Sequence, residues 1–519
     1  AIVVVKPEKG RTARMDRELA EKLEAYKNGL SEKERRELVD RTEALEAYQS
    51  AEDRPEDLEK IPVLKREDIS RKIAPIFNEE RTVAGIPMIF HEIETNGIGY
   101  LDLLFDMSGV PEELLPYVGI LQAVLGVIDT THYEYGELFN EINVHTGGIG
   151  TSLELYPDVT KVKEKEFKAT FEIKAKALYE KLSVAFDMMG EILTESKLED
   201  EKRLLEILQM LKSRLLMRFQ SAGHTTAVLR SLAYTSPSAR LKDLTSGIEF
   251  YRVVARITEH FEEEKEDLIR KLKSLAVRLF RAEGMMISYT ASREGLDGLE
   301  DFVDSMKKRL FTDSVEEAVC ILHCEKKNEG FKTASKVQYV ARSGNFIDGG
   351  AQYSGALQIL KVILSYDYLW LNLRVKGGAY GCMSGFGRSG EAYFTSYRDP
   401  NVRETNEIYE GIVDYLKNFQ VEPRDMTKYV IGTISDMDAP VPPSIRGSRG
   451  LSAYLSGVDD AMMKKEREEV LSAQAEDIRN LSPVVEAILA QGSLCAIGNE
   501  EKIEGNREMF GETKNLFHA

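Results

Sequence analysis

Cysteine is scarce in this sequence, and long apolar runs are missing from it. The 519 residues include four cysteines, Cys320, Cys324, Cys382 and Cys495, which are too few for a disulfide framework. That scarcity indicates a reducing intracellular setting, either the cytoplasm or an organellar matrix. No stretch of about 18 apolar residues occurs, so we expect no transmembrane helix and no membrane partner.

Positive charge is also in deficit. The chain carries 87 acidic and 69 basic residues, for a formal net charge of -18. Such a surface repels phosphate backbones, which argues against a nucleic-acid partner, and it would attract cationic peptides. Solubility alone is a sufficient explanation of the same charge. With 43% hydrophobic residues, the chain is long enough for two or three globular domains.

The start of the chain lacks the pattern of a signal peptide. Residues 1–7, Ala-Ile-Val-Val-Val-Lys-Pro, have no basic segment and no cleavage site of small residues. The pattern predicts a β-strand from the first residue. A strand at that position suggests a piece of a longer protein, or a processed chain.

A zinc-peptidase motif is absent as well. Two histidines four residues apart on a helix, with an intervening glutamate, would bind zinc and activate water. None of the seven histidines has a partner at that spacing. The nearest candidate, His91-Glu92-Ile93-Glu94, lies in a strand pattern, so His91 and Glu92 would face opposite sides of a sheet. We expect His91 to be an ordinary strand histidine.

The segment Cys320-Ile321-Leu322-His323-Cys324 could also suggest a metal site. Its alternation predicts a buried strand instead, with His323 pointing away from both thiols. The two cysteines would then lie about 13 Å apart, too far for one tetrahedral ion.

Other catalytic motifs are missing or have a structural explanation. Neither a G-x-S-x-G elbow nor a P-loop occurs. The segment Gly385–Gly390 matches G-x-G-x-x-G, but a dinucleotide site needs a helix after it. Residues 391–397 alternate as a strand, which predicts a hairpin turn at Gly385–Gly390.

The N-terminal region is charged and helical. Over residues 13–50, apolar side chains recur at helical spacing, Asn28-Gly29 interrupts the pattern, and Ser31-x-x-Glu34 is a capping box for a second helix. The apolar positions are Met15, Leu19, Leu23, Tyr26, Leu38, Leu45 and Tyr48. We expect a helical hairpin that serves as a linker.

The rest of the chain contains an internal repeat of about 230 residues. Gly147-Gly148 and Gly377-Gly378 each follow a pair of helices and precede two strands. Tyr133-Glu134-Tyr135 and Tyr366-Asp367-Tyr368 precede them in equivalent places. This pattern predicts an α+β protein with two repeated domains, each a mostly antiparallel sheet with helices on one face. The expected divisions are 1–80 for the terminal strand and linker, 81–325 for the first domain and 326–519 for the second.

Several individual elements are expected from periodicity. Residues 238–280 are predicted as one long helix. Residues 349–373 are predicted as a helix interrupted near Tyr366-Asp367. A helix over 423–437 ends before the prolines at 440, 442 and 443.

The strongest candidate for function is Leu373-Arg374-Val375-Lys376-Gly377-Gly378-Ala379-Tyr380-Gly381. Arg374 would lie on the last turn of a helix, and Tyr380 would follow a flexible corner. A guanidinium and a phenol held there can both reach one carboxylate or developing oxyanion. The structural alternative is an ordinary helix C-terminus, with Arg complementing the dipole and Gly ending the helix.

The segment RVKGGAYG resembles the C-terminal half of the pitrilysin/insulinase-type (inverzincin) zinc metallopeptidases, in the presequence protease branch, and the resemblance extends over about residues 1–515. It implies that zinc is bound by an N-terminal half not present here, where the metal-bound water attacks unfolded peptide substrates. It also implies that Arg374 and Tyr380 assist catalysis through substrate and oxyanion contacts, beside substrate-binding positions Gly377 and Gly378. The chain itself would bind no metal and would be inactive alone.

Two alternatives remain open. The chain could be a zinc-less paralogue that acts as a non-catalytic partner subunit or peptide-binding module. It could also be an unrelated α+β repeat protein, which would explain the repeat but not the RVKGGAYG segment.

Overall fold

The computed structural model describes residues 8, 10–51, 54–58, 60–62, 64–316 and 318–517. The chain forms two compact units, residues 1–69 and 70–519. The strand expected over residues 1–7 and the histidine at 518 lie outside the described residues.

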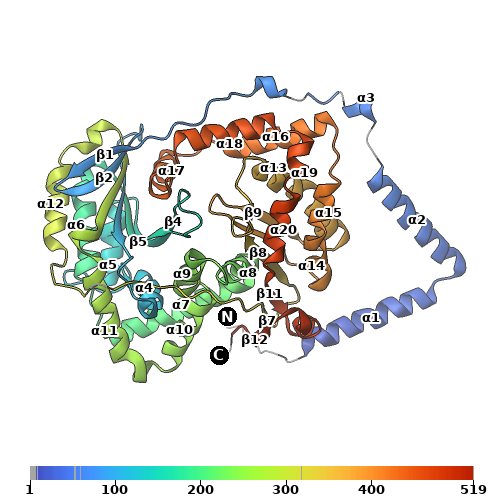
Figure 1. Cartoon of the computed structure of the whole chain (residues 1–519). Helices are drawn as coiled ribbons and strands as arrows, with labels where there is room; N and C mark the ends of the chain where they lie inside the picture. Colours follow the sequence, from blue (N-terminus) through green and yellow to red (C-terminus); the bar gives the residue numbers. More distant parts are fainter. Residues whose placement is uncertain are drawn as a thin grey trace. The chain divides into compact units, whose positions relative to one another are not determined.

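The first unit is helical, as expected. Its helices are α1 (Arg11–Gly29), α2 (Glu32–Ser50) and α3 (Pro55–Leu58). Ser31 caps α2 reciprocally: its hydroxyl accepts the Glu34 N–H, and its own N–H donates to the Glu34 carboxylate at 2.8 Å. Helices α1 and α2 diverge from this turn (Figure 1). The seven apolar side chains on which the helical pattern rests are all exposed.

The second unit begins with a six-stranded sheet in the order β1-β2-β6-β3-β5-β4. Its strands are β1 (Glu79–Val83), β2 (Ile86–Glu92), β3 (Ile98–Asp106), β4 (Ile149–Pro157), β5 (Phe167–Leu178) and β6 (Met285–Ala291). Helices cover one face, where the apolar residues of the strands are buried (Figure 1). These helices include α4 (Leu115–Val124), α6 (Leu182–Thr194), α11 (Phe261–Leu279) and α12 (Leu299–Arg309).

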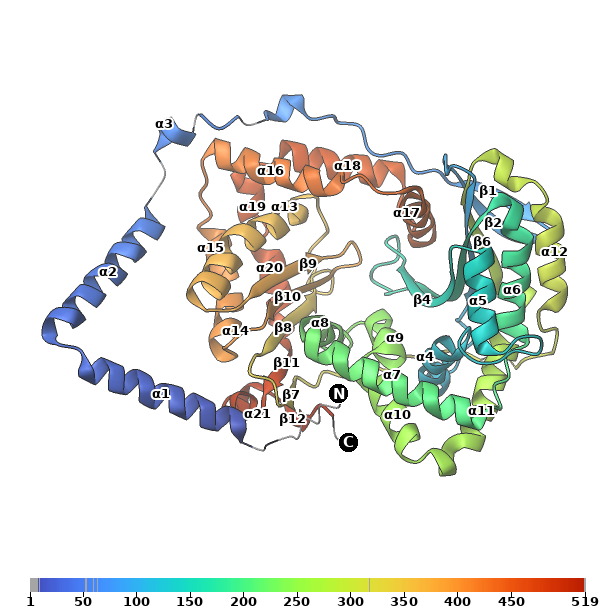
Figure 2. The ribbon, with the colours of Figure 1, turned by 180° about the vertical axis from the view of Figure 1, so that it is seen from behind.

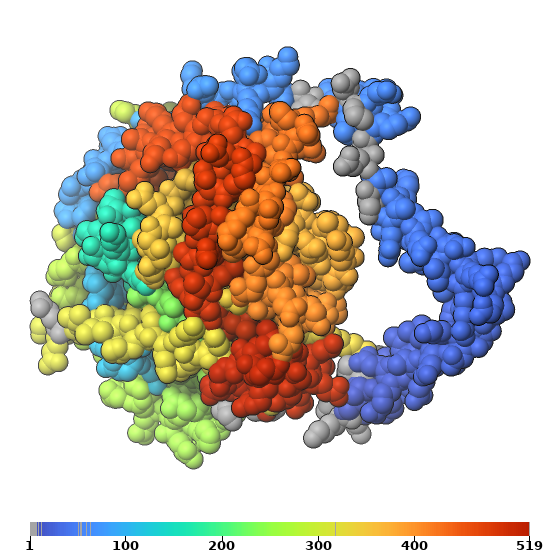
Figure 3. Space-filling model, turned by 45° about the vertical axis from the view of Figure 1, so that its right-hand side comes forward, coloured from blue at the N-terminus to red at the C-terminus, as the bar shows by residue number. Residues whose placement is uncertain are grey.

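The second sheet has the order β12-β7-β11-β8-β10-β9. Its strands are β7 (Glu329–Thr333), β8 (Tyr339–Asn345), β9 (Gly381–Phe386), β10 (Glu391–Tyr397), β11 (Ser493–Asn499) and β12 (Glu512–Asn515). Its covering helices include α13 (Ala356–Ile363), α14 (Arg403–Glu410), α20 (Ser482–Ala490) and α21 (Glu500–Glu504). In Figure 3 the orange and red helices of this region form one continuous surface.

The two sheets have the same topology, which confirms the repeat. Strand β3 pairs antiparallel with β5 and β6, and β6 pairs parallel with β2. Strand β8 pairs antiparallel with β10 and β11, and β11 pairs parallel with β7. The sheets differ at the outer strand next to β2 or β7: β1 is antiparallel, whereas β12 is parallel.

Each sheet receives a helix from the other half on its second face (Figure 2). Helix α8 (Gly223–Leu232) lies on β8, β10 and β11, where a Cβ atom at Gly223 would meet the Tyr339 ring at 2.2 Å. Helix α17 (Pro443–Ser456) lies on β2, β4, β5 and β6, with Leu451 packed beside Leu104. A Cβ atom at Gly447 would lie 1.8 Å from Thr290 Oγ1. Glycine at 223 and 447 therefore allows both helices to approach the sheets closely.

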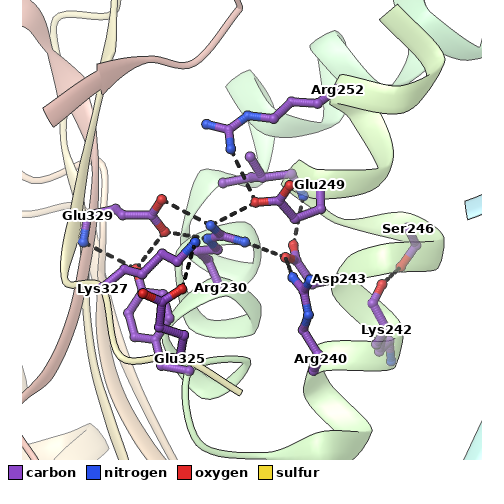
Figure 4. Close-up of polar contacts among 12 residues, drawn as sticks. Arg230, Arg240, Lys242, Asp243, Ser246, Glu249, Arg252, Glu325, Lys327 and Glu329 are labelled. Carbon is purple, nitrogen blue, oxygen red and sulfur yellow. Dashed lines mark hydrogen bonds and ion pairs between the residues drawn. The ribbon is translucent and has the colours of Figure 1, made fainter. Parts of the chain in front are cut away.

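A buried ion-pair network ties α8 to the second sheet (Figure 4). Arg230 of α8 lies 2.6 Å from Asp243 and 3.0 Å from Glu329 of β7. The Tyr234 hydroxyl donates to Glu329 at 3.0 Å. Burial alone would raise the pKa of Glu329, but the hydrogen bond and charge of Arg230 outweigh it and hold that pKa below its ordinary value.

Two sequence-based expectations were wrong. The long helix over 238–280 is three helices, α9 (Pro237–Ser246), α10 (Ile248–Glu259) and α11, separated at Gly247 and His260. Asp243 explains the first break, since its carboxylate accepts the Ile248 N–H at 2.9 Å and starts α10 anew.

The strand predicted at residues 319–324 is irregular, with Val319 81% and Ile321 64% exposed. Cys320 and Leu322 do pack against the core, so the alternation reports one buried side without any pairing to a neighbouring strand.

Candidate functional site

The segment before the Gly-Gly corner is a widened helix. Helix α13 continues into two π-helical segments, Leu364–Tyr368 and Trp370–Lys376. The interruption expected near Tyr366-Asp367 is therefore a change of pitch, which is common at functional sites. Asp367 holds this region by accepting hydrogen bonds from the Tyr415 and Tyr429 hydroxyls at 3.1 and 3.2 Å. Arg374 lies on the last turn, where it was expected.

The two glycines are required by the backbone. Gly378 has φ 79°, in the left-handed region. A Cβ atom at Gly377 would lie 2.7 Å from the Leu373 carbonyl oxygen. The Ala379 N–H donates to that same oxygen at 2.9 Å, and Tyr380 N–H then joins the sheet through the Tyr397 carbonyl at 3.0 Å. This corner turns the chain back over the end of the helix.

The corner brings Arg374 and Tyr380 together. The guanidinium of Arg374 donates to the Tyr380 backbone carbonyl, and its carbon lies 5.2 Å from the Tyr380 ring centre and 4.3 Å from that of Trp370. Arg374 forms no ion pair with any carboxylate that the structure describes. Tyr380 is 62% exposed, and no described residue hydrogen-bonds its hydroxyl. Both polar groups are thus positioned by stacking and remain available to a ligand.

An aromatic cluster that sequence reasoning missed supports Tyr380. The Tyr380 ring lies edge-on to Tyr397 at 5.9 Å. Tyr397 in turn contacts His224 of α8 at 4.9 Å and Tyr339 of β8 at 5.8 Å. Burial lowers the pKa of His224, which favours the neutral ring. No local sequence signal joins these residues, because they come from both repeats.

A cavity adjoins this cluster. Its volume is about 510 Å³, and His224 of α8, Met383 of β9 and Tyr393 of β10 contribute to its wall. Residues 393, 395 and 397 share one face of β10, so Tyr397 continues the cavity wall toward Tyr380. The Arg374–Tyr380 pair therefore lies at one end of a hollowed surface between the repeats.

Cys382 lies on the opposite face of β9 and is not a nucleophile at neutral pH. Burial raises its pKa to about 11, and the charge of Arg374 opposes that shift only partly. A protonated thiol is a weak nucleophile and a poor metal ligand.

The described residues do not fit a zinc ion. Among them, no three His, Cys, Asp or Glu side chains are grouped in a way that could hold a metal. His91 is a satisfied strand histidine, as expected: Nδ1 donates to the Phe77 carbonyl at 2.6 Å, and Nε2 accepts from the Ser288 hydroxyl at 3.1 Å. The segment Gly385–Gly390 contains the turn of the β9–β10 hairpin, so it is not a dinucleotide loop.

The helices were also compared with membrane spans. Within the described ranges, no helix combines the length and the apolar character needed to cross a bilayer.

Comparison with protein families gives two matches along the chain. The family described as the associated domain of peptidase M16, subfamily C, matches residues 5–257, and "PreP C-terminal domain" matches residues 328–500. Together they span most of both repeats.

Individual relatives agree with these matches. Protein HypA of Clostridium perfringens is 37% identical over 516 residues, which are 99% of this chain and 53% of HypA. Presequence protease 1 of Arabidopsis thaliana, which is chloroplastic and mitochondrial, is 27% identical over 95% of this chain and 46% of its own length. The chain thus spans about half the length of these curated relatives.

A solved structure shares the fold. The peptidase M16 inactive domain from Pseudomonas fluorescens matches with a TM-score of 0.56 and 14% identity, over 81% of this chain and 97% of that one. The family matches, the curated relatives and the repeated α+β fold lead to one conclusion: the chain belongs to the peptidase M16 family, as the C-terminal half of a presequence protease-like protein.

Proposed function

We propose that this chain is the metal-free half of a zinc metalloendopeptidase that degrades unfolded peptides. The zinc ion and its ligands would belong to an N-terminal half of the same protein, since the described residues here do not fit the metal. Residues 81–325 and 326–519 would be its two peptidase-like domains. Because all four cysteines are free, we place the protein in a reducing compartment, the cytoplasm or an organellar matrix.

The observation that carries the proposal is the pairing of Arg374 with Tyr380. Both lie at the surface without a charged partner among the described residues, although their positions are fixed by ring contacts and by the corner. A surface arginine that serves stability usually pairs with a carboxylate or covers apolar side chains in the core. An arginine and a phenol kept free at one point instead match the needs of polar recognition.

These groups suit an extended peptide. The Arg374 guanidinium already binds a backbone carbonyl, that of Tyr380, so it can bind a substrate carbonyl or carboxylate in the same manner. The Tyr380 hydroxyl can donate to the oxyanion that forms as the scissile carbonyl becomes tetrahedral. Gly377 and Gly378 have no side chains, so a substrate backbone could approach this corner.

The N-terminal half would also have a surface to contact. The apolar side chains of α1 and α2 remain exposed, with Tyr48 81% and Tyr26 61% accessible. Exposed apolar stripes on helices are typical of surfaces that bind another protein segment. We propose that these helices link to the N-terminal half and are covered by it.

The test is to add the N-terminal half of the same protein, with zinc, to this chain and to measure kcat and KM on an unfolded peptide. Tyr380→Phe and Arg374→Gln should each lower kcat/KM by roughly tenfold to a thousandfold, the range for losing one oxyanion-stabilising donor. Tyr366→Phe is the matched control, because Tyr366 is 77% exposed on the same π-helical region. Unchanged turnover in both site variants would refute the roles assigned to Arg374 and Tyr380.

A further inference from the structure

A second cavity lies apart from the Arg374–Tyr380 corner. It is enclosed by the extended segment 70–78, the loop 437–442, α17 and α18 (Asp460–Ser472). Its volume is about 760 Å³, within the range of roughly 300–1,000 Å³ that is usual for small-molecule sites. Nothing in the proposed peptidase role uses it.

The walls of this cavity are largely apolar. They include half-buried aliphatic and thioether side chains from all four surrounding segments. These side chains are Ile73, Ile76, Val441, Val458 and Met463. Walls of this kind favour an occupant with an apolar body of several carbon atoms.

The deeper charges of the cavity neutralise one another. Glu466, 6% exposed, accepts a hydrogen bond from Arg388 Nε at 2.9 Å. Arg467, 2% exposed, pairs with Asp438 at 2.7 Å. These two pairs leave no unbalanced charge inside the cavity.

The rim carries two positive charges that no described carboxylate balances. Arg446 and Arg449 are three residues apart on α17, so both project from one side of the helix, and both are exposed. Arg446 lies over the Phe77 ring at 5.0 Å. Two free guanidinium groups beside an apolar cavity are unusual on a chain of net charge -18, where acidic partners are abundant.

We propose that this cavity binds an apolar molecule that bears a single carboxylate. The apolar body would fill the space between the segment 70–78 and α18, and Arg446 with Arg449 would hold the carboxylate at the mouth. A short apolar peptide with a free C-terminus and a medium-chain fatty acid share this chemistry. The site is independent of the proposed peptidase role, since it shares no lining residue with the Arg374–Tyr380 corner.

The experiment measures binding to the full chain by fluorescence anisotropy. The probe is fluorescein-labelled Leu-Leu-Leu with a free carboxylate, compared with its C-terminal amide. The amide should bind at least about tenfold more weakly, because it lacks the charge that the arginines recognise. Binding of the acid should also weaken as salt is raised, since the rim is exposed. Equal affinity of the acid and the amide would overturn the proposal.

Variants locate the site. Arg446→Gln with Arg449→Gln should weaken binding of the acid about tenfold or more, and Ala453→Trp should block the cavity directly. The charge-matched control is Lys202→Gln with Arg214→Gln on the exposed side of α7 (Glu201–Ser221), which should leave binding unchanged. Wild-type affinity in the rim variant or in the filled variant would contradict the assignment.

Two further measurements complete the design. Competition by octanoate separates the sources: displacement at lower concentration than unlabelled Leu-Leu-Leu indicates a fatty acid, and the reverse indicates a peptide terminus. Thermal unfolding checks each variant. If the double variant is destabilised, Arg449→Gln alone remains informative, since that guanidinium has no described ion pair and should still show weakened binding.

Discussion

Gly447 of α17 lies so close to Thr290 of β6 that a Cβ atom at residue 447 would be 1.8 Å from the threonine hydroxyl oxygen. This contact allows a helix from the second repeat to lie on the polar face of the first sheet. His91, on the neighbouring strand β2, faces the same helix at Gly450, where an added Cβ would be 3.0 Å from Nδ1.

Gly447→Ala is therefore expected to destabilise the protein. The added methyl group must displace Thr290 or lift α17, which we expect to cost about 1–3 kcal/mol in the free energy of unfolding. The matched control is Gly432→Ala on α16 (Pro423–Met437), where the nearest atom would be Val362 Cγ1 at 3.5 Å. That variant should be neutral or more stable by up to about 1 kcal/mol. Urea denaturation measures both, and equal stability of the two variants would refute the packing argument.

The network around Arg230 should be sensitive to the loss of its centre. Arg230→Met leaves Glu329 and Asp243 buried without their cation, and we expect a loss of about 3–5 kcal/mol. Arg252→Met is the control, because Arg252 pairs with Glu249 from the half-exposed edge of the network and should cost at most about 1 kcal/mol. Denaturant unfolding at neutral pH compares them. A mild effect at Arg230 would mean that the pairs do not hold α8 to the sheet.

Asp102 should make stability depend on pH. Burial raises its pKa to about 7, with Lys174 opposing and Glu172 adding to the shift. The folded state therefore keeps the proton more tightly than the unfolded chain, so the contribution of this group is complete below about pH 4 and is lost as pH rises toward 7. Asp102→Asn has no such loss, and its stability relative to the wild type should increase over that interval.

Lys174→Met provides the control for this pH effect. Removing the cation takes away the interaction that favours ionised Asp102, so the loss of stability should extend above pH 7. Unfolding free energies measured from pH 4 to pH 8 decide the matter. A difference between Asp102→Asn and wild type that is constant across this range would contradict the assignment.

Gly378→Ala tests the corner that holds Arg374 beside Tyr380. A φ of 79° costs an L-residue about 1–2 kcal/mol, which either destabilises the corner or displaces Tyr380. Gly381→Ala, three residues later in β9, is the control, because its Cβ would meet only Tyr397 at 3.7 Å. In the reconstituted enzyme we expect turnover to fall for Gly378→Ala and to be nearly unchanged for Gly381→Ala.

Local sequence patterns predicted the parts of this fold that local chemistry determines. The Ser31 capping box starts α2 where it was expected, and the helix over Pro423–Met437 has the predicted bounds. The recurring Gly-Gly corners indicated the repeat that the two matching sheets confirm.

Contacts between distant segments were beyond such patterns. Nothing near Gly447 indicates that its helix packs against Thr290, and nothing near Arg230 indicates Glu329, 99 residues away. The cluster that supports Tyr380 joins His224 to Tyr397 across the two repeats. The short strands β7 and β12 were missed because they pair in parallel at the end of a sheet and have no turn between them.

The exchange of α8 and α17 between the repeats means that the two sheets cannot be inherited or engineered as separate modules. A gene divided between α12 and β7 would yield two products, each missing a helix it needs and carrying one that has no surface to cover. Evolution of this half-protein would then have had to preserve both crossings at once, whereas a simple tandem duplication could lose either copy.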